Sequence, residues 1–395
     1  MSKPFHVYLD LDVRNDDILS GVPPALSFEE TRTQPFLDGD ASDYFCAIAR
    51  FTLQPSNSLP VLIPIIDTNQ GVPSPSVNQT IYKISFWEQA GPVTPTAGRQ
   101  IYTQNIVFVP ENRTIAIPRP PVGVQDTSSE YYYLHSYKSF VNMINTTLRS
   151  LYSSLPLVIG HYSPPYVEWD NASCTATLYA DTYYFDLNGN MNAFTGSGGR
   201  DRKFEIYFNS RLYQLFSTLP ATYTSATGDL NYRLDIFGDA SNTTKLPLND
   251  TNGGSMYNIA LSQEISTIAV WSPIESIVFT STSLPIHPSL SSIPRVLTSG
   301  NTSVMGSGQP NLLNILTDFQ VAVSGSNQYR PEISYVPQGE YRLVDMYTNS
   351  NLSRIDLQVY WRDKAGELHR ILLYPGCSAS VKLLFRHKGF YLGAD

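Results

Sequence analysis

The sequence predicts an all-β protein, because turn-forming residues interrupt short segments that are rich in aromatic and β-branched residues. The chain has 395 residues, among them 26 Tyr, 18 Phe, 28 Pro and 24 Gly. Aromatic and β-branched side chains favour pleated sheets, whereas Pro and Gly favour turns. Many of the short segments also alternate apolar and polar residues, which is the pattern of a strand with one buried face.

The N-terminal segment "HVYLDLDV" (6–13) is the clearest example of this alternation. Its apolar residues share one face, and its polar residues share the other. The apolar set is Val7, Leu9, Leu11 and Val13, and the opposite set is His6, Tyr8, Asp10 and Asp12. Further strands are predicted over 43–53, 80–88 and 99–110, each bounded by Gly, Pro or Asn.

Two helices interrupt the strands in the middle of the chain. Apolar residues recur at helical spacing over 133–155, so this segment predicts an amphipathic helix. The recurring residues are Tyr137, Phe140, Val141, Ile144, Leu148 and Leu151. Asn209 is predicted to cap a second, short helix that ends before Pro220.

Two stretches poor in apolar residues predict domain boundaries, one at 118–125 with several prolines and one at 238–255. Strand-rich sequence flanks both, and the helices lie between them. We therefore expect a β-sandwich built from residues 1–120 and 251–395, with a second, mainly β domain inserted as residues 121–250. Insertions are tolerated at loops whose ends are close together.

Charge and cysteine content exclude several classes of function. The formal net charge is −8 and no basic run exceeds a pair, which argues against direct nucleic-acid binding. Cys46, Cys174 and Cys377 are too few for a disulfide framework and are expected to be reduced. The first residues contain no apolar signal core, and no window reaches about 18 apolar residues, so neither secretion nor a membrane span is expected.

Residues 357–388 contain the strongest candidate for chemistry. Cys377, His369 and Asp363 are the residue types of a cysteine nucleophile system. The alternation around Trp361 instead predicts a strand, a hairpin loop over "DKAGE" and a return strand, which would separate the histidine from the cysteine by ~20 Å. We therefore expect a solvent-facing sheet with an edge thiol. In the closing strand, the inward-facing residues are expected to be Val381, Leu383 and Phe385.

The remaining candidate sites are explained equally well by ordinary turns and exposed polar surface. Asp186, Asn188 and Asn190 have the first spacings of a calcium loop, but Met191 replaces its glycine, so calcium binding and a plain turn both stay open. Asp10, Asp12, Asp16 and Asp17, like Asp38, Asp40 and Asp43, look like exposed acidic groups. Glycosylation is not expected at the eight sequons, which are Asn78, Asn112, Asn145, Asn171, Asn242, Asn249, Asn301 and Asn351. We predict no catalytic, cofactor-binding or metal-binding residue, and no enzyme.

Both ends of the chain resemble the minor capsid (penton) proteins of virophages and of Polinton-like and adintovirus-type double-stranded DNA viruses. The similar segments are "NDDILSGVPPALSFEETRTQPFLDGDASDYFCAIARFTL", "LSQEISTIAVWSPIESIVFTSTSLPI" and "GEYRLVDMYTNSNLSRIDLQVYWRDKAGELHRILLYPGCSASVKLLFRHKGF". The resemblance implies a single jelly-roll base with an inserted outer domain. It also implies that five copies plug each icosahedral vertex of the virion, surrounded by a double jelly-roll major capsid protein. The family supplies no catalytic residues.

An alternative function is carbohydrate or receptor binding at the virion surface. In that case the aromatic residues Tyr179, Tyr183, Tyr184 and Phe185 would stack on sugars, although core and sheet positions explain them as well. A glycosidase would need two suitably placed carboxylates, and no such pair stands out. For the vertex function, strand 6–13 is a candidate for pairing with a neighbouring copy, because an open sheet edge accepts added strands.

Overall fold

The computed structural model contains two compact units, which are described separately. The first comprises Met1–Pro60, Pro273–Ala322 and Arg330–Asp395, and the second comprises Val61–Ser272 and Val323–Tyr329. Within these limits the structure describes residues 6–17, 23–55, 58–68, 70, 76–89, 100–120, 125–155, 164–181, 203–236, 243–245, 257–290, 295–298, 301–304, 312–321, 332–337 and 341–391.

The two units divide the chain at other places than the expected boundaries near 120 and 250. The strands β4 (Gln79–Gln89) and β5 (Ile101–Val107) pair with β8 (Lys203–Phe208) and its neighbours, inside the second unit. The proline-rich stretch after residue 117 therefore lies within that unit. Alternation identifies a strand but not the sheet to which it belongs, which is why the sequence placed β4 and β5 with the sandwich.

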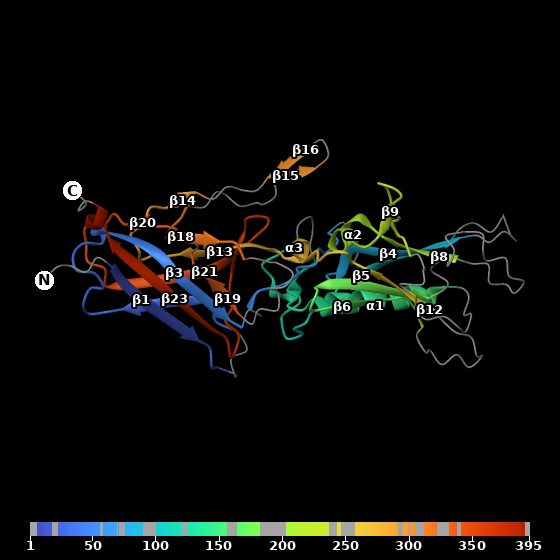
Figure 1. Ribbon diagram of the computed structural model, residues 1–395, viewed down its shortest axis with the longest axis horizontal. Helices are drawn as coiled ribbons and strands as arrows, with labels where there is room; N and C mark the ends of the chain where they lie inside the picture. Colours follow the sequence, from blue (N-terminus) through green and yellow to red (C-terminus); the bar gives the residue numbers. More distant parts are fainter. Residues whose placement is uncertain are drawn as a thin grey trace, which may run out of the picture. The chain divides into compact units, whose positions relative to one another are not determined.

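The first unit is a jelly-roll β-sandwich of two antiparallel sheets (Figure 1). We name them the β1 sheet, with order β1-β23-β3-β19 and β20 also on β3, and the β21 sheet, with order β18-β13-β21-β2 and β22 also on β21. The strands of the β1 sheet are β1 (His6–Arg14), β3 (Tyr44–Gln54), β19 (Ile333–Tyr335), β20 (Val344–Asp345) and β23 (Ser378–His387). Those of the β21 sheet are β2 (Ser27–Thr31), β13 (Ile274–Thr280), β18 (Ile315–Phe319), β21 (Arg354–Asp363) and β22 (Leu368–Arg370).

The first and last long strands of the chain pair with each other in the β1 sheet. The register runs from His6 opposite Arg386 to Arg14 opposite Ser378. The predicted alternation of β1 is confirmed, since Leu9 and Leu11 are buried whereas the residues between them are exposed. On the other side, β23 pairs with β3, with a register shift between Lys382 and Leu383. The residues predicted to face inward on β23 are buried, as expected.

Aromatic side chains fill the space between the two sheets. Phe51 of β3 meets Phe279 of β13 edge to face, with ring centres 5.0 Å apart, and both are fully buried. Phe319 of β18 stacks on Tyr335 of β19 at 4.3 Å. Because these pairs connect strands of different sheets, they hold the sandwich together as packed aromatic contacts.

Short elements complete the first unit. They are the pairs β14 (Ser289–Leu290) with β17 (Leu312–Leu313) and β15 (Arg295–Thr298) with β16 (Asn301–Val304), and the 3₁₀ helices Ala41–Asp43 and Lys388–Tyr391. The Gly- and Ser-rich segment 287–311 thus contains the strands β14, β15 and β16.

Among its described residues, the second unit combines two further antiparallel sheets with three α-helices and one 3₁₀ turn. The β4 sheet has the order β5-β4-β8-β10-β9, and the β7 sheet has the order β11-β12-β7-β6. The remaining strands are β6 (Tyr166–Asp170), β7 (Thr175–Asp181), β9 (Ala221–Tyr223), β10 (Tyr232–Leu234), β11 (Thr243–Lys245) and β12 (Tyr257–Ser262). The helices are α1 (Tyr137–Ser154), α2 (Ser210–Leu215), α3 (Ile268–Trp271) and the 3₁₀ turn Glu130–Tyr132.

Helix α1 supplies the core of the second unit, and its predicted apolar stripe is confirmed. Phe140, Ile144, Leu148 and Leu151 are fully buried. Trp271 of α3 lies at the centre of an aromatic cluster, within 5.1–5.6 Å of the rings of Phe140, Tyr137, Trp169 and Phe216. Its Nε1–H donates to the Leu215 carbonyl at 2.6 Å, so the buried indole has its polar group satisfied. None of the helices in the described ranges has the length and apolar character of a membrane span.

Candidate functional site

The open edge of the β1 sheet is the first candidate for a functional surface. Strand β1 is outermost in its sheet, with β23 on one side (Figure 1). No strand pairs with its other side among the residues that the structure describes. The edge backbone groups of such a strand can accept an added strand from another chain. Its outward row, which consists of His6, Tyr8, Asp10, Asp12 and Arg14, is exposed.

A charged strip crosses three strands on the outer face of the same sheet. Asp10 lies 3.6 Å from the Arg50 guanidinium of β3 and 3.3 Å from Lys382 Nζ of β23. Lys382 Nζ also lies 5.9 Å from the centre of the Tyr8 ring. Such half-exposed ion pairs stabilise a fold by well under about 1 kcal/mol. This mixture of charges and an exposed tyrosine is instead suited to contact with a complementary surface.

The structure brings together two of the three residues that were considered as a cysteine nucleophile system, His369 and Asp363. His369 Nε2 hydrogen-bonds Asp363 Oδ2 at 3.0 Å, and the imidazole stacks on Trp361 at 4.1 Å. Both residues are buried, with 5% and 6% exposure, so the expected solvent-facing position is wrong for them. The hairpin itself is confirmed, because β22 places His369 opposite Trp361 on β21. In this register the His369 side chain lies close enough to Asp363, where the loop begins, to form their hydrogen bond.

Cys377 belongs to a different part of the sandwich. It directly precedes β23 in the β1 sheet, whereas His369 lies in the β21 sheet. The thiol is 1% exposed and accepts from Ser58 Oγ at 3.8 Å, so the expected edge thiol is wrong. All three cysteines are free and buried, as expected for reduced thiols. Burial raises the pKa of the Cys46 thiol, which keeps it protonated and unreactive.

Asp356 of β21 has the most perturbed carboxylate of the jelly-roll unit. It accepts from the Ser281 hydroxyl at 2.9 Å, from the Thr282 hydroxyl at 2.6 Å and from the Ser283 backbone N–H at 2.7 Å. Burial by itself would raise its pKa, but the bonds from Ser283, Thr282 and Ser281 lower the pKa to about 2. These hydrogen bonds therefore connect the loop after β13 to strand β21.

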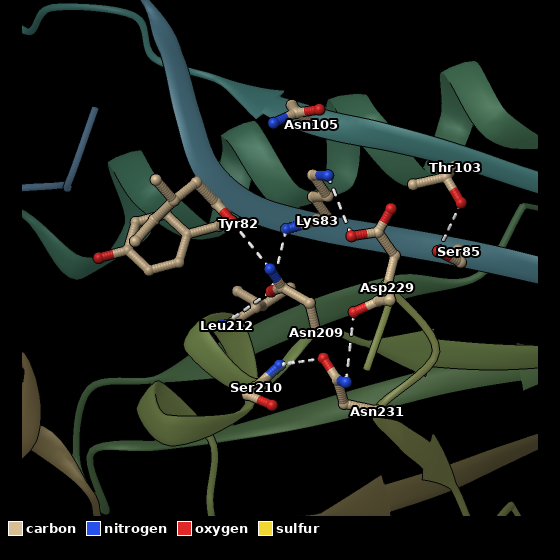
Figure 2. Close-up of polar contacts among 12 residues, drawn as sticks. Tyr82, Lys83, Ser85, Thr103, Asn105, Asn209, Ser210, Leu212, Asp229 and Asn231 are labelled. Carbon is tan, nitrogen blue, oxygen red and sulfur yellow. Dashed lines mark hydrogen bonds and ion pairs between the residues drawn. The ribbon is translucent and has the colours of Figure 1, made fainter. Parts of the chain in front are cut away.

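In the second unit, Asn209 connects α2 with the β4 sheet (Figure 2). Its Oδ1 accepts from the backbone N–H groups of Leu212 and Lys83, both at 3.1 Å, and its Nδ2 donates to the Ile81 carbonyl at 2.8 Å. The predicted cap of α2 is thus confirmed, and the same side chain also bridges to β4. Beside it, Lys83 Nζ pairs with Asp229 Oδ1 at 3.0 Å.

An open groove of about 520 Å³ lies between α1 and the edge strand β5. Amide, hydroxyl and apolar side chains line it, among them Gln104, Asn142, Thr146 and Val107. Glu111 closes one end, where its carboxylate accepts from the backbone N–H groups of His135 and Ser136, next to the start of α1. Burial opposes its ionisation, but hydrogen bonds from His135 and Ser139 lower the pKa of Glu111 overall. Sequence patterns did not reveal this groove, since its two walls, β5 and α1, lie far apart in the sequence.

The aromatic residues considered for sugar binding are described only in part. Tyr179 of β7 stacks on Tyr166 of β6, with ring centres 5.0 Å apart and planes at 15°. Burial is the largest cause that raises the pKa of both tyrosines. One face of each ring is thus covered by the other ring. Tyr183, Tyr184 and Phe185 lie outside the described residues.

The calcium candidates Asp186, Asn188 and Asn190 also lie outside the described residues. Among the sequons, Asn145 has its amide engaged on both sides, since it donates to the Val167 carbonyl and accepts from the Val167 N–H.

The model of the family "Sputnik minor capsid protein V18/19" matches residues 7–387, nearly the whole chain. The chain belongs to this minor capsid protein family. The predicted resemblance is thereby confirmed, and the match includes the inserted unit as well as the jelly roll.

Two proteins of Sputnik virophage are similar to this minor capsid protein. Structural protein V19 is 30% identical over 190 residues, which are 47% of this chain and 81% of V19. Uncharacterized protein V18 is 30% identical over 166 residues, which are 41% of this chain and 91% of V18.

Solved structures agree with this family assignment over almost the full length. A chain in the 3.5 Å cryo-EM structure of the Sputnik virophage has a TM-score of 0.76 at 25% identity, with 98% of this chain and 99% of that chain covered. The selenomethionine-labelled penton protein of mavirus has a TM-score of 0.58 at 18% identity, with coverage of 96% and 99%, and shows the shared fold. This minor capsid protein is therefore a structural protein of the virion capsid.

Proposed function

We propose that five copies of this chain form a ring that plugs a five-fold vertex of the capsid, within a lattice of double jelly-roll major capsid protein. The family match over residues 7–387 is the observation that carries this proposal. In a closed five-fold ring, one flank of each subunit contacts the other flank of its neighbour, so the two flanks must be complementary. The proposed role is structural and involves no catalysis, in keeping with the separation of Cys377 from His369 in different sheets.

In this proposal the edge of β1 contributes to the contact between neighbouring copies. Its free side offers backbone hydrogen-bonding groups, and the strip around Asp10 offers charges of both signs beside the exposed Tyr8. A short extended segment of the adjacent subunit could then add to the β1 sheet. The inserted unit, Val61–Ser272, is the proposed outer domain.

The mass of the purified chain in solution tests the ring directly. We expect a pentamer by light scattering or native mass spectrometry, and sixty copies per particle, since twelve vertices carry five each. A monomer at all concentrations, together with another copy number in particles, would refute the vertex role.

Two variants test the contribution of β1. Deletion of residues 1–20 removes the strand, but it also uncovers β23 within the same chain. The change Asp12→Lys keeps the strand and the ion pairs of Asp10 with Arg50 and Lys382, and it puts a lysine on the outward row, which opposes strand addition. We expect both variants to assemble poorly. Normal pentamers from the folded lysine variant would eliminate β1 from the contact.

Receptor or glycan binding by the inserted unit is a second proposal, which the groove between α1 and β5 favours. Its amide and hydroxyl groups beside apolar side chains are the groups that recognise sugars and polar peptides. Asn142→Trp would obstruct the groove at an exposed position of α1. Glycan-array binding that this change abolishes would support the proposal, and no binding at high protein concentration would count against it.

A further inference from the structure

We propose that Asp363, Glu367 and His369 form a binding site for one divalent transition-metal ion, with zinc as the best fit. The site lies at the hairpin that joins β21 to β22 in the jelly-roll unit. This inference departs from the expectation of no metal that the sequence supported, and it does not depend on the pentameric ring.

The three side chains converge. Each offers one ligand atom, and these atoms all lie within 4.8 Å of one another. His369 Nε2 and Asp363 Oδ2 are 3.0 Å apart. In a tetrahedral zinc site with bonds of about 2.0–2.1 Å, neighbouring ligand atoms are about 3.3 Å apart. A small outward shift of the two atoms would therefore let an ion replace their hydrogen bond.

Two of the ligands are held in place before any ion binds. Asp363 Oδ1 accepts from the backbone N–H groups of Ala365 and Glu367 at 2.9 and 2.8 Å, which leaves Oδ2 to face the imidazole. The imidazole is fixed by its stacking on Trp361, and it is buried. Fixed orientation of this kind strengthens metal binding, because little conformational freedom is lost when the ion enters.

The hairpin loop brings the third ligand to the same place. Gly366 has a φ of +88°, a left-handed conformation that suits glycine, and the Asp363 N–H donates to the Glu367 carbonyl at 3.0 Å. Glu367 is exposed, and one of its carboxylate oxygens lies within 4.8 Å of the ligand atoms of Asp363 and His369. Water would complete the coordination from the open side.

The ligand set selects the class of ion. One imidazole and two carboxylates suit zinc and related transition metals, whereas calcium and magnesium prefer six or more oxygen ligands. Two carboxylates also neutralise the charge of a divalent ion beside the buried side chains of Asp363 and His369.

Titration of the full-length, chelator-treated protein with zinc tests the proposal, followed by calorimetry and by metal analysis after gel filtration. We expect one ion per chain, and a visible absorption band of a four-coordinate ion when cobalt is used as the probe. Glu367→Gln changes an exposed side chain and should weaken binding at least tenfold without unfolding the protein. His369→Gln should abolish it.

Glu29→Gln is the matched control, because it replaces an exposed carboxylate on β2, in the same sheet. It should bind zinc like the unchanged protein. Hydrogen exchange in peptides covering 361–370 should slow when zinc is added, which places the ion at the hairpin. Absence of stoichiometric binding, or binding that both Glu367→Gln and His369→Gln leave unchanged, would overturn the proposal.

Discussion

Replacement of Asp356 by Asn should destabilise the jelly-roll unit by about 1–2 kcal/mol at neutral pH. The lowering of the pKa from 3.8 to about 2 corresponds to roughly 2.5 kcal/mol in favour of the charged form, at about 1.4 kcal/mol per unit. Thr282, one of the donors, is exposed, so solvent screening reduces this figure. An Asn side chain keeps one acceptor oxygen but directs its NH₂ group at donors of the loop.

The stabilisation by Asp356 should also depend on pH. Its pKa is lower in the folded than in the unfolded chain, so the contribution is complete above about pH 5 and is lost as the pH falls through about 2. Urea unfolding followed by fluorescence should therefore show a difference between the unchanged protein and Asp356→Asn that shrinks between these values. Hydrogen exchange of peptides covering 274–290 would locate the effect in the loop after β13.

Asp12→Asn is the control for this experiment, because it removes an exposed carboxylate from the same unit. We expect it to change stability by less than about 0.5 kcal/mol. The reasoning would be refuted if Asp356→Asn were as stable as this control at pH 7, or if its deficit stayed constant down to pH 2.

Three further predictions concern the second unit. Asn209→Ala should cost about 2–3 kcal/mol in urea unfolding, since it removes the cap of α2 and the bond to Ile81, whereas Asn209→Asp should cost less because it keeps the capping oxygen. Trp271→Ala should cost about 3–5 kcal/mol by leaving a cavity in the aromatic cluster and removing one of the two donors of the Leu215 carbonyl, which keeps the Thr267 hydroxyl; a midpoint shift as small as that of an exposed substitution would contradict this packing. Glu111→Gln should lower the thermal midpoint at pH 7, and this loss should shrink as the pH falls below 4.5, because the pKa of Glu111 is lowered in the folded protein and its contribution is lost in acid; an equal loss at every pH would disprove the role of its charge.

Local patterns of the sequence predicted individual elements well. The alternation of β1, the stripe of α1 and the cap at Asn209 all follow from spacing within about twenty residues, and the structure confirms each. The hairpin after Trp361 followed from its glycine-containing loop. These features depend on interactions between near neighbours, which is the information that periodicity contains.

Features that depend on residues far apart in the sequence could not be predicted from local patterns. Asp356 obtains its donors from a loop more than seventy residues earlier, and nothing around it in the sequence identifies them. The burial of Cys377 likewise depends on Ser58. The pairing of His369 with Asp363 is an intermediate case, because the hairpin register implies it once the loop length is known.

The pairing of β1 with β23 has a consequence for synthesis of the protein. His6 lies opposite Arg386, so the first strand has no partner until the ribosome has added the 380 residues that separate them. The segment Val61–Ser272, which supplies the strands and helices of the second unit, emerges long before that moment. Sheets that close over such long separations form slowly, because the loop entropy is lost before the contacts are gained. A chain that ends before β23 therefore lacks the strand that pairs with β1, and its β1 sheet stays open.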